Sequence, residues 1–256
     1  MHALLETRAL TVSIGGKQVC RELNLVVNGA ERWGILGVNG VGKTTLLHTL
    51  AGLKMPVSGE VVLSGRPLAG MKRRDAARIC GLMPQDSDDA FPATVMETAL
   101  IGRHPHLSAW AWESTEDERI AGSALESVGL AGMAQRMTHT LSGGERRRLA
   151  LATLLVQNPA LLLLDEPVNH LDLHHQIETL ELLTKQALQH GKALVMVLHD
   201  VNLAARYCDC LLLLFGDGDV LQGKVGEVLN TENLARLYHH PVHSVEAEGR
   251  KLYYPA

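Results

Sequence analysis

Short apolar runs separated by turn residues fill the first 85 residues and the last hundred. Runs of this length and composition are typical of β-strands. The predicted strands are residues 9–14, 23–27, 33–37, 60–65, 80–85, 160–167, 193–200 and 210–220. Helical spacing is found between some of them, at residues 43–51 and 174–191. Continuous apolar strands that alternate with helices indicate a mostly parallel sheet with helices on both faces.

The pattern changes between residues 86 and 158, where no clear strand can be recognised. Ile120, Ala124 and Val128 recur there at every fourth position, which predicts an amphipathic helix. We therefore expect one α/β domain into which residues 86–158 are inserted as a helical subdomain. The predicted core consists of residues 1–85 and 159–256.

Composition places the chain among ordinary globular proteins. It is 46% hydrophobic and 20% charged with a net charge of −4, so nothing favours non-specific binding to nucleic acid or anionic lipid. Cysteine spacing gives neither a disulfide framework nor a zinc ribbon, and Cys208 and Cys210 flank an apolar run that is typical of a core strand. The N-terminus lacks the pattern of a signal peptide, and no apolar run is long enough to span a bilayer. Any role at a membrane is expected to require a partner.

Residues 37–45, with the sequence GVNGVGKTT, match the phosphate-loop pattern G-x-x-x-x-G-K-[ST]. Glycines let such a loop curl so that its N–H groups point at an anion, and the following helix directs its positive end to the same place. Lys43 is expected to neutralise phosphate oxygens, and the Thr44 hydroxyl is a ligand suited to Mg²⁺. The predicted nucleotide-binding residues are Gly37, Asn39, Gly40, Gly42, Lys43, Thr44 and Thr45.

Polar residues end three later strands, at the edge where a parallel sheet binds ligands. Asp165 and Glu166 follow four leucines: Asp165 is expected to hold Mg²⁺, and Glu166 to polarise the attacking water. His199 ends the next apolar run, where it could contact the γ-phosphate. Gln85 ends another predicted strand, and its amide oxygen suits Mg²⁺ or water.

A second glycine-containing helix start lies at residues 141–145, with the sequence LSGGE. Ser142, Gly143 and Gly144 would expose backbone N–H groups there, as a phosphate site requires. The helical insert separates them from Lys43, so this site is expected to be too distant for the nucleotide of its own chain. Two copies facing head to tail would each complete the other's site and enclose two ATP molecules.

These motifs resemble the ATP-hydrolysing subunits of ABC transporters in order and spacing, and the resemblance covers essentially the whole chain. The combination of LSGGE with the phosphate loop is specific to that family. The resemblance implies a P-loop ATPase core with an antiparallel β subdomain, ATP with Mg²⁺ as cofactors, and Glu166 and His199 as the catalytic pair beside Gln85. It implies that Asp172 couples the two sites of the dimer. The signature expected to contact the opposing nucleotide is Ser142, Gly143, Gly144 and Glu145.

The resemblance also implies partners and a location. They are a second copy of the chain, two permease subunits and, indirectly, a periplasmic or lipoprotein binding protein, with the chain peripheral on the cytoplasmic face of the inner membrane. The sequence after His199, which contains NLAARY and ENLARLY, resembles ATPases of importers for iron-siderophores, haem and cobalamin. The alternatives are a molybdate or zinc importer, an exporter, a soluble ABC ATPase, and a regulatory module that binds nucleotide without turnover.

Several positions depart from the family pattern or have no assigned role. Ile14 stands where an aromatic side chain usually stacks on adenine, which would cost about 1 kcal/mol of stacking. Trp110 and Trp112 are expected to pack inside the insert, and the other interpretation is a permease contact. A histidine cluster contains an i, i+4 pair suited to a metal, although no cysteine or acid obviously completes a ligand set. The cluster consists of His170, His174 and His175.

Overall fold

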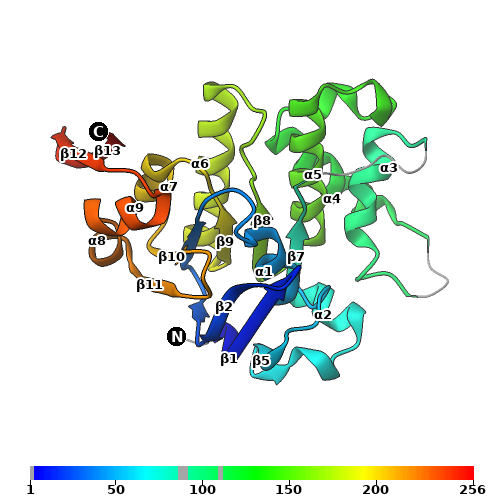
Figure 1. Ribbon diagram of the computed structural model, residues 1–256. Helices are drawn as coiled ribbons and strands as arrows, with labels where there is room; N and C mark the ends of the chain where they lie inside the picture. The colour runs from blue at the N-terminus through cyan, green and yellow to red at the C-terminus, as the bar shows by residue number, and fades with distance from the viewer. Residues whose placement is uncertain (1–2, 86–91, 109–111) are drawn as a thin grey trace.

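A computed structural model describes residues 3–85, 92–108 and 112–256 (Figure 1). A six-stranded sheet in the order β11-β10-β4-β9-β8-β7 forms the centre of the fold. Its neighbours pair in parallel except at the edge, where β11 runs antiparallel to β10. The strands are β4 (Arg32–Leu36), β7 (Cys80–Met83), β8 (Leu161–Asp165), β9 (Ala193–Val197), β10 (Cys210–Leu214) and β11 (Val220–Lys224).

A second, antiparallel sheet is built around the long strand β1, which pairs with β2, β3 and β5. A separate hairpin, β12-β13, forms the C-terminal end of the chain and projects from the body of the molecule (Figure 1). These strands are β1 (Ala3–Ile14), β2 (Lys17–Leu23), β3 (Val26–Asn28), β5 (Ser58–Leu63), β6 (Arg66–Pro67), β12 (Val242–Ala247) and β13 (Arg250–Pro255). The predicted α/β core with an antiparallel β subdomain is therefore confirmed.

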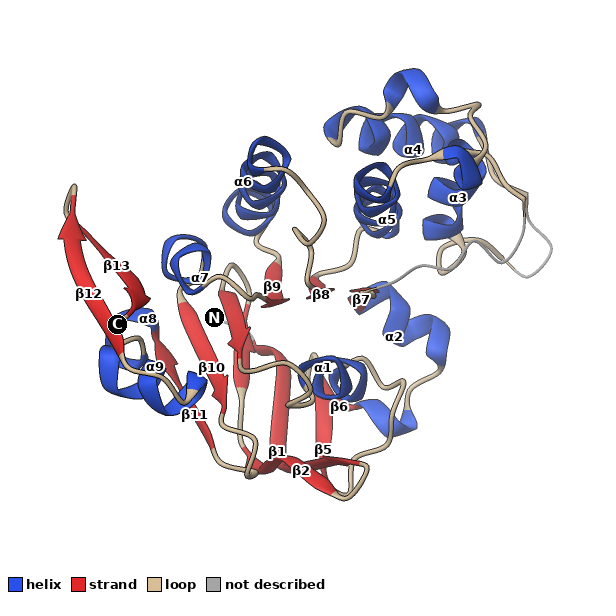
Figure 2. Ribbon diagram, turned by 45° about the horizontal axis from the view of Figure 1, so that its top comes forward, coloured by secondary structure: helices blue, strands red, loops and turns tan. Residues whose placement is uncertain are grey.

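Helices cover both faces of the central sheet, as Figure 2 shows. On one face α1 and the antiparallel sheet form one buried core, and on the other face α5, α6 and α7 contribute to a second. Strand β8 shows the reason, because Leu161 and Leu163 belong to the first core while Leu162 and Leu164 belong to the second. The helices are α1 (Lys43–Leu50), α2 (Arg73–Ile79), α3 (Val95–Leu100), α4 (Thr115–Ser127), α5 (Gly143–Gln157), α6 (Leu173–His190), α7 (Val201–Tyr207), α8 (Val225–Val228) and α9 (Thr231–Tyr238).

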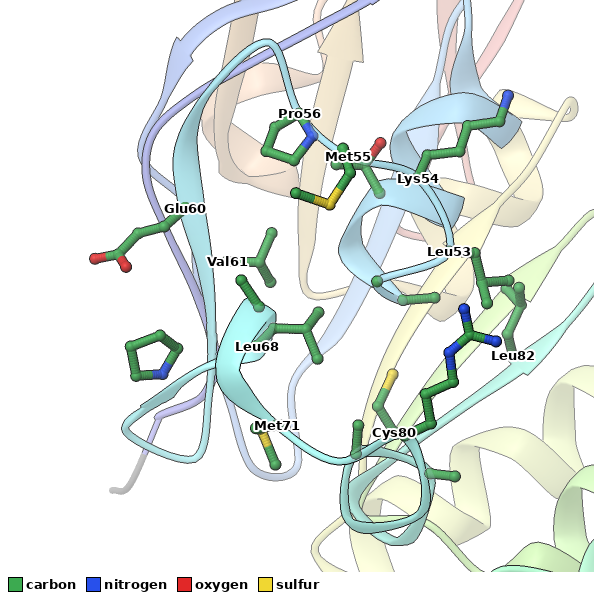
Figure 3. Close-up of a pocket in the computed structure, with 18 of the residues that line it drawn as sticks. Leu53, Lys54, Met55, Pro56, Glu60, Val61, Leu68, Met71, Cys80 and Leu82 are labelled. Atoms are coloured by element: carbon green, nitrogen blue, oxygen red, sulfur yellow. The ribbon is translucent and has the colours of Figure 1, made fainter.

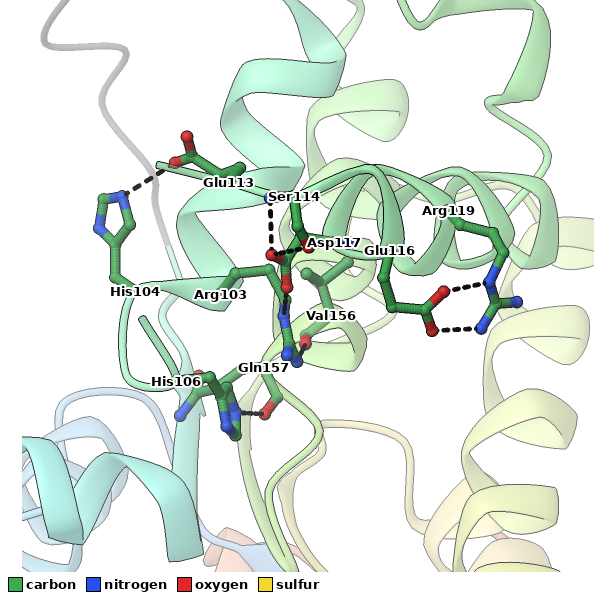
Figure 4. A network of polar contacts seen from close by, with 10 residues as sticks. All are labelled: Arg103, His104, His106, Glu113, Ser114, Glu116, Asp117, Arg119, Val156 and Gln157. Carbon is green, nitrogen blue, oxygen red and sulfur yellow. Dashed lines mark hydrogen bonds and ion pairs between the residues drawn. The ribbon is translucent and has the colours of Figure 1, made fainter. Parts of the chain in front are cut away.

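Helices α3, α4 and α5 form a group to one side of the sheet (Figure 1), and each begins with a capping box. A polar network ties this group together where α5 ends (Figure 4). Arg103 donates to the Asp117 carboxylate at 2.7 Å and to the Val156 carbonyl at 3.3 Å. Hydrogen bonds from Ser114, followed by that from Arg103, lower the pKa of Asp117 to about 2. The Gln157 amide, at the end of α5, donates to the Ala77 carbonyl at 2.6 Å, which joins the group to the end of α2.

Two of the predicted runs are not single strands in the structure. In the run at 210–220, β10 ends at Leu214 and the antiparallel strand β11 begins at Val220, because Gly216 and Gly218 adopt φ values of 93° and 89° and reverse the chain between them. The run at 23–27 is interrupted at Leu25, whose N–H donates to the side-chain hydroxyl of Thr7 in β1 at 2.8 Å instead of to a backbone carbonyl.

The packing role expected for Trp112 is also wrong, since its side chain is 89% exposed. Trp110 lies outside the described residues. Burial raises the pKa of the Cys208 thiol to about 12, which agrees with a place in the core. Across residues 3–85, 92–108 and 112–256, no helix has both the length and the apolar character needed to cross a membrane.

Candidate active site

The phosphate loop connects β4 to α1 and is shaped by two glycines with left-handed backbone. Gly40 has φ 75° and Gly42 has φ 105°. A Cβ atom on Gly42 would lie 2.4 Å from the Val19 side chain, so only glycine fits this bend. Helix α1 begins at the next residue, and its first N–H groups have no partner within the helix. The loop therefore presents backbone donors and a positive helix end at one point.

Lys43 places its ammonium group inside this loop. Its side chain is only 6% exposed, and Nζ donates to the Gly37 carbonyl at 2.8 Å and to the Val38 carbonyl at 3.1 Å. Burial lowers the pKa of Lys43, and the carboxylates of Glu166 and Asp165 act in the opposite direction. A cation is thus held between the loop and two acids.

Neighbouring strands bring the predicted catalytic side chains together. In the register of the sheet, Met83 of β7 lies beside Leu164 of β8, and Asp165 lies beside Val197 of β9. The residues that follow these strands consequently meet at the carboxyl edge. The Glu166 carboxylate lies 2.6 Å from His199 Nε2 through Oε1, and its Oε2 accepts from Gln85 Nε2 at 3.2 Å.

A third contact to Glu166 comes from Asn169, which the sequence did not mark as functional. Asn169 Nδ2 donates to Glu166 Oε2 at 2.8 Å, and its backbone N–H donates to the Glu166 carbonyl at 3.1 Å. Glu166 has φ 51°, a strained value for a non-glycine residue of the kind that collects at functional sites. The turn after β8 therefore fixes the orientation of the carboxylate.

Asp165 is fully buried beside the loop. Among the described residues, no donor forms a well-aligned hydrogen bond with either carboxylate oxygen. Burial raises the pKa of Asp165, and the Glu166 charge adds to this, whereas the Thr44 hydroxyl, His48 and Arg147 lower it. A buried carboxylate without a well-aligned hydrogen-bond donor is suited to bind a cation, so the residues present fit Mg²⁺.

These groups surround a polar cavity of about 420 Å³. Ile14 lines it and is 43% exposed, so an aliphatic side chain occupies the place expected for a stacking ring. The cavity is lined by Ile14, Asn39, Gly40, Gly42, Lys43, Thr44, Thr45, Gln85, Glu166, Asn169 and His199. Gly37 and Asp165, which were also predicted as site residues, are not among these lining residues.

The predicted signature residues do not line the cavity. Ser142 caps α5, and its hydroxyl accepts from the Glu145 N–H at 3.2 Å while its own N–H donates to the Glu145 carboxylate at 2.7 Å. Ser142 and Gly143 are exposed, and a Cβ atom on Gly143 would meet nothing within 4 Å. This helix start is therefore open to an incoming molecule.

Asp172 is likewise outside the cavity, at the start of α6, where its carboxylate accepts from the His175 N–H at 2.9 Å. Two histidines of the cluster have different carboxylate partners: His175 pairs with Asp172, and His174 lies 3.3 Å from Glu178. In the described parts of the chain, no group of three or more histidine, cysteine, aspartate or glutamate side chains could hold a metal ion.

A larger hollow of about 510 Å³ lies between α1, β5 and α2 (Figure 3). Its lining is mainly apolar and includes Leu53, Met55, Leu68 and Leu82, and it contains no residue of the phosphate loop. A triphosphate needs donors and positive charge, so the smaller polar cavity is the candidate nucleotide site.

A sequence profile described as "ABC transporter" matches residues 20–169, more than half of the chain. The chain belongs to the ABC transporter family. The petrobactin import ATP-binding protein FpuD of Bacillus anthracis is 38% identical and covers 92% of this chain and 86% of its own length. The ferric enterobactin transport ATP-binding protein FepC of Escherichia coli K12 is 36% identical, with coverage of 92% and 87%.

Solved structures agree with this assignment. An inward-facing ABC transporter described as of metal-chelate type matches with a TM-score of 0.86 and 27% identity, over 100% of this chain and 98% of that one. A dimeric, post-hydrolysis ATP-binding cassette with ADP and phosphate matches with a TM-score of 0.75 and 26% identity, over 86% and 98%. The predictions of the family, of its P-loop ATPase fold and of ATPase activity are confirmed.

Proposed function

We propose that this chain is the ATP-hydrolysing subunit of an importer that takes up a metal chelate of the iron-siderophore, haem or cobalamin class through a separate permease. The observation that carries ATP hydrolysis is the Glu166 carboxylate, held by Gln85, Asn169 and His199 at the mouth of the Lys43 loop. The substrate class is supported by the relatives that are named for import of petrobactin, ferric enterobactin and hemin.

Each residue of the site has a defined task in this proposal. Lys43 and the loop N–H groups bind the triphosphate, and Glu166 orients the attacking water and accepts its proton, with His199 beside it. Thr44, Gln85 and Asp165 would hold Mg²⁺, which supplies positive charge to the phosphate oxygens.

Two copies act together in this proposal, arranged head to tail. The exposed helix start at Ser142 to Gly144 supports this arrangement, because it is built to bind an anion but does not line its own chain's cavity. Asp172 lies at the surface and couples the two sites. Residues 1–85 and 159–256 form the catalytic core, and residues 86–158 form the helical subdomain that carries the signature.

The permease would dock on the apolar hollow of Figure 3. Leu53, Met55 and Val57 stand at or next to this hollow and are 63%, 82% and 67% exposed. An exposed apolar patch of this kind marks a binding surface. The chain would then be peripheral, on the cytoplasmic face of the inner membrane, and a periplasmic or lipoprotein binding protein would deliver the substrate to the permease.

The test is uptake into vesicles that contain this chain and its permease. Labelled ferric siderophore, haem and cobalamin should be offered separately, with the binding protein and with ATP inside the vesicles. We expect ATP-dependent uptake of one of these chelates and no uptake with Glu166→Gln. ATP-dependent uptake of molybdate or zinc ions, or export, would refute the metal-chelate assignment. Absence of phosphate release by the complex would refute the assignment as an ATPase.

A further inference from the structure

A buried arginine, Arg147, lies in the second turn of α5 and contacts the backbone of the active site. Its side chain is 8% exposed, which is rare for arginine unless the guanidinium group is fully engaged. The signature residue Ser142 caps the same helix five residues earlier, roughly 7.5 Å away along the axis. Arg147 therefore moves with the signature.

The guanidinium group of Arg147 joins two segments that are far apart in the sequence. Nη1 donates to the carbonyls of Pro84 and Gln85, at 2.5 Å and 2.7 Å. Nη2 donates to the carbonyl of Asp165 and, at 2.7 Å, to that of Glu166. Its planar fork of donors thus spans the ends of β7 and β8.

These two segments carry the side chains that meet in the cavity. Strand pairing between β7 and β8 ends at Met83 and Leu164, and Pro84, the next residue after β7, provides no N–H to continue it. Beyond the ladder, Arg147 joins both backbones to one group. The Gln85 amide then meets the Glu166 carboxylate at 3.2 Å.

We propose that Arg147 is a positioning residue of the ATPase: it ties the signature helix to the backbone of Gln85 and Glu166, so that the placement of α5 sets the geometry of the catalytic carboxylate. This inference rests on the proposed function. It concerns turnover rather than ATP binding, because Arg147 does not line the cavity.

Arg148 provides a matched control on the same helix. Its guanidinium group is also partly buried, but it donates to the Val128 carbonyl at 3.0 Å, within the helical subdomain. Replacing Arg148 by glutamine removes a comparable hydrogen bond from α5 without touching the segments of Gln85 and Glu166. This variant measures how much kcat and Tm fall when α5 loses a hydrogen bond that does not involve the active site.

The experiment compares the full chain with Arg147→Lys, Arg147→Gln, Arg147→Met and Arg148→Gln. Phosphate release against ATP concentration gives kcat and KM, calorimetry with a non-hydrolysable ATP analogue gives Kd, and thermal unfolding reports folding. Since a misplacement of about 1 Å can cost about 100-fold in rate, we expect Arg147→Gln and Arg147→Met to lose about 10- to 100-fold in kcat. The Kd should stay within about threefold, because the phosphate loop is unchanged.

Arg147→Lys keeps the charge but not the fork of donors, so its kcat should fall between those of the wild type and Arg147→Gln. Arg148→Gln should keep kcat within about threefold of the wild type, even if its Tm falls as much as that of Arg147→Gln. A wild-type kcat in folded Arg147→Gln, or an equal loss in Arg148→Gln, would overturn the inference. If Arg147→Met does not fold, the kcat values of Arg147→Lys and Arg147→Gln test the inference. A wild-type chain that does not hydrolyse ATP would instead overturn the proposed function.

Discussion

Replacement of Glu166 by glutamine separates the proposed catalytic role of this side chain from its structural one. Glu166 is 8% exposed, and its carboxylate lies 2.6 Å from His199 Nε2 and accepts from Gln85 and Asn169 on its other oxygen. A glutamine of the same shape can direct its oxygen to Gln85 and Asn169 and its NH₂ group to His199. The contacts can therefore persist while the base is lost.

The magnitudes differ strongly between stability and turnover. Exchange of charge-assisted hydrogen bonds for neutral ones should cost about 1 kcal/mol of unfolding free energy, or roughly 2–4 °C in Tm. Loss of a general base should lower kcat by about 10²- to 10⁴-fold, which is about 3–5.5 kcal/mol of barrier. The change also removes a negative charge close to Lys43, so the affinity for ATP should not fall.

The assays are phosphate release and light scattering with Mg²⁺ and ATP. Glu166→Gln should bind ATP and turn over at least about 100-fold more slowly than the wild type. It should accumulate as a dimer, because the ATP bound in the closed dimer is not hydrolysed. Glu181→Gln, on an exposed position of α6, is the matched control and should behave as the wild type. A Glu166→Gln protein that keeps kcat within about threefold, or that stays monomeric with ATP, would refute this reasoning.

Three further substitutions test other parts of the site. Lys43→Ala should abolish ATP binding measured by calorimetry, because the loop loses its buried cation. Ile14→Tyr should tighten ATP binding about fivefold by adding about 1 kcal/mol of stacking, with an unchanged affinity for inorganic triphosphate as the control. Asp165→Asn should raise the Tm of the ligand-free protein at pH 7 by roughly 2–4 °C and weaken Mg²⁺-dependent ATP binding. Burial raises the pKa of Asp165, so the folded state keeps this proton to a higher pH than the unfolded chain does, and stability falls as pH rises through that interval. A lower Tm for Asp165→Asn would contradict this sign.

Sequence patterns were sufficient for the parts of the fold that depend on local burial. The strand run ending in Asp165 is buried on both faces, and its position was predicted to within two residues. The run at 210–220 was misjudged because apolar composition does not show direction, and a glycine turn reversed the chain inside it. The exposure of Trp112 could not be predicted either, since the packing preference of tryptophan is an average and not a property of one position.

The candidate site shows the same division. The phosphate loop was found because its chemistry is local: glycines with left-handed backbone and a following helix must be adjacent in the chain. Arg147 and Asn169 were missed for the opposite reason. Arg147 acts on backbone carbonyls, and every residue has a carbonyl, so the acceptors at Gln85 and Glu166 leave no trace in the sequence. The candidate ligand-binding groups of this ATPase can thus be predicted from its motifs, whereas the residues that hold them in place are recognised only in the fold.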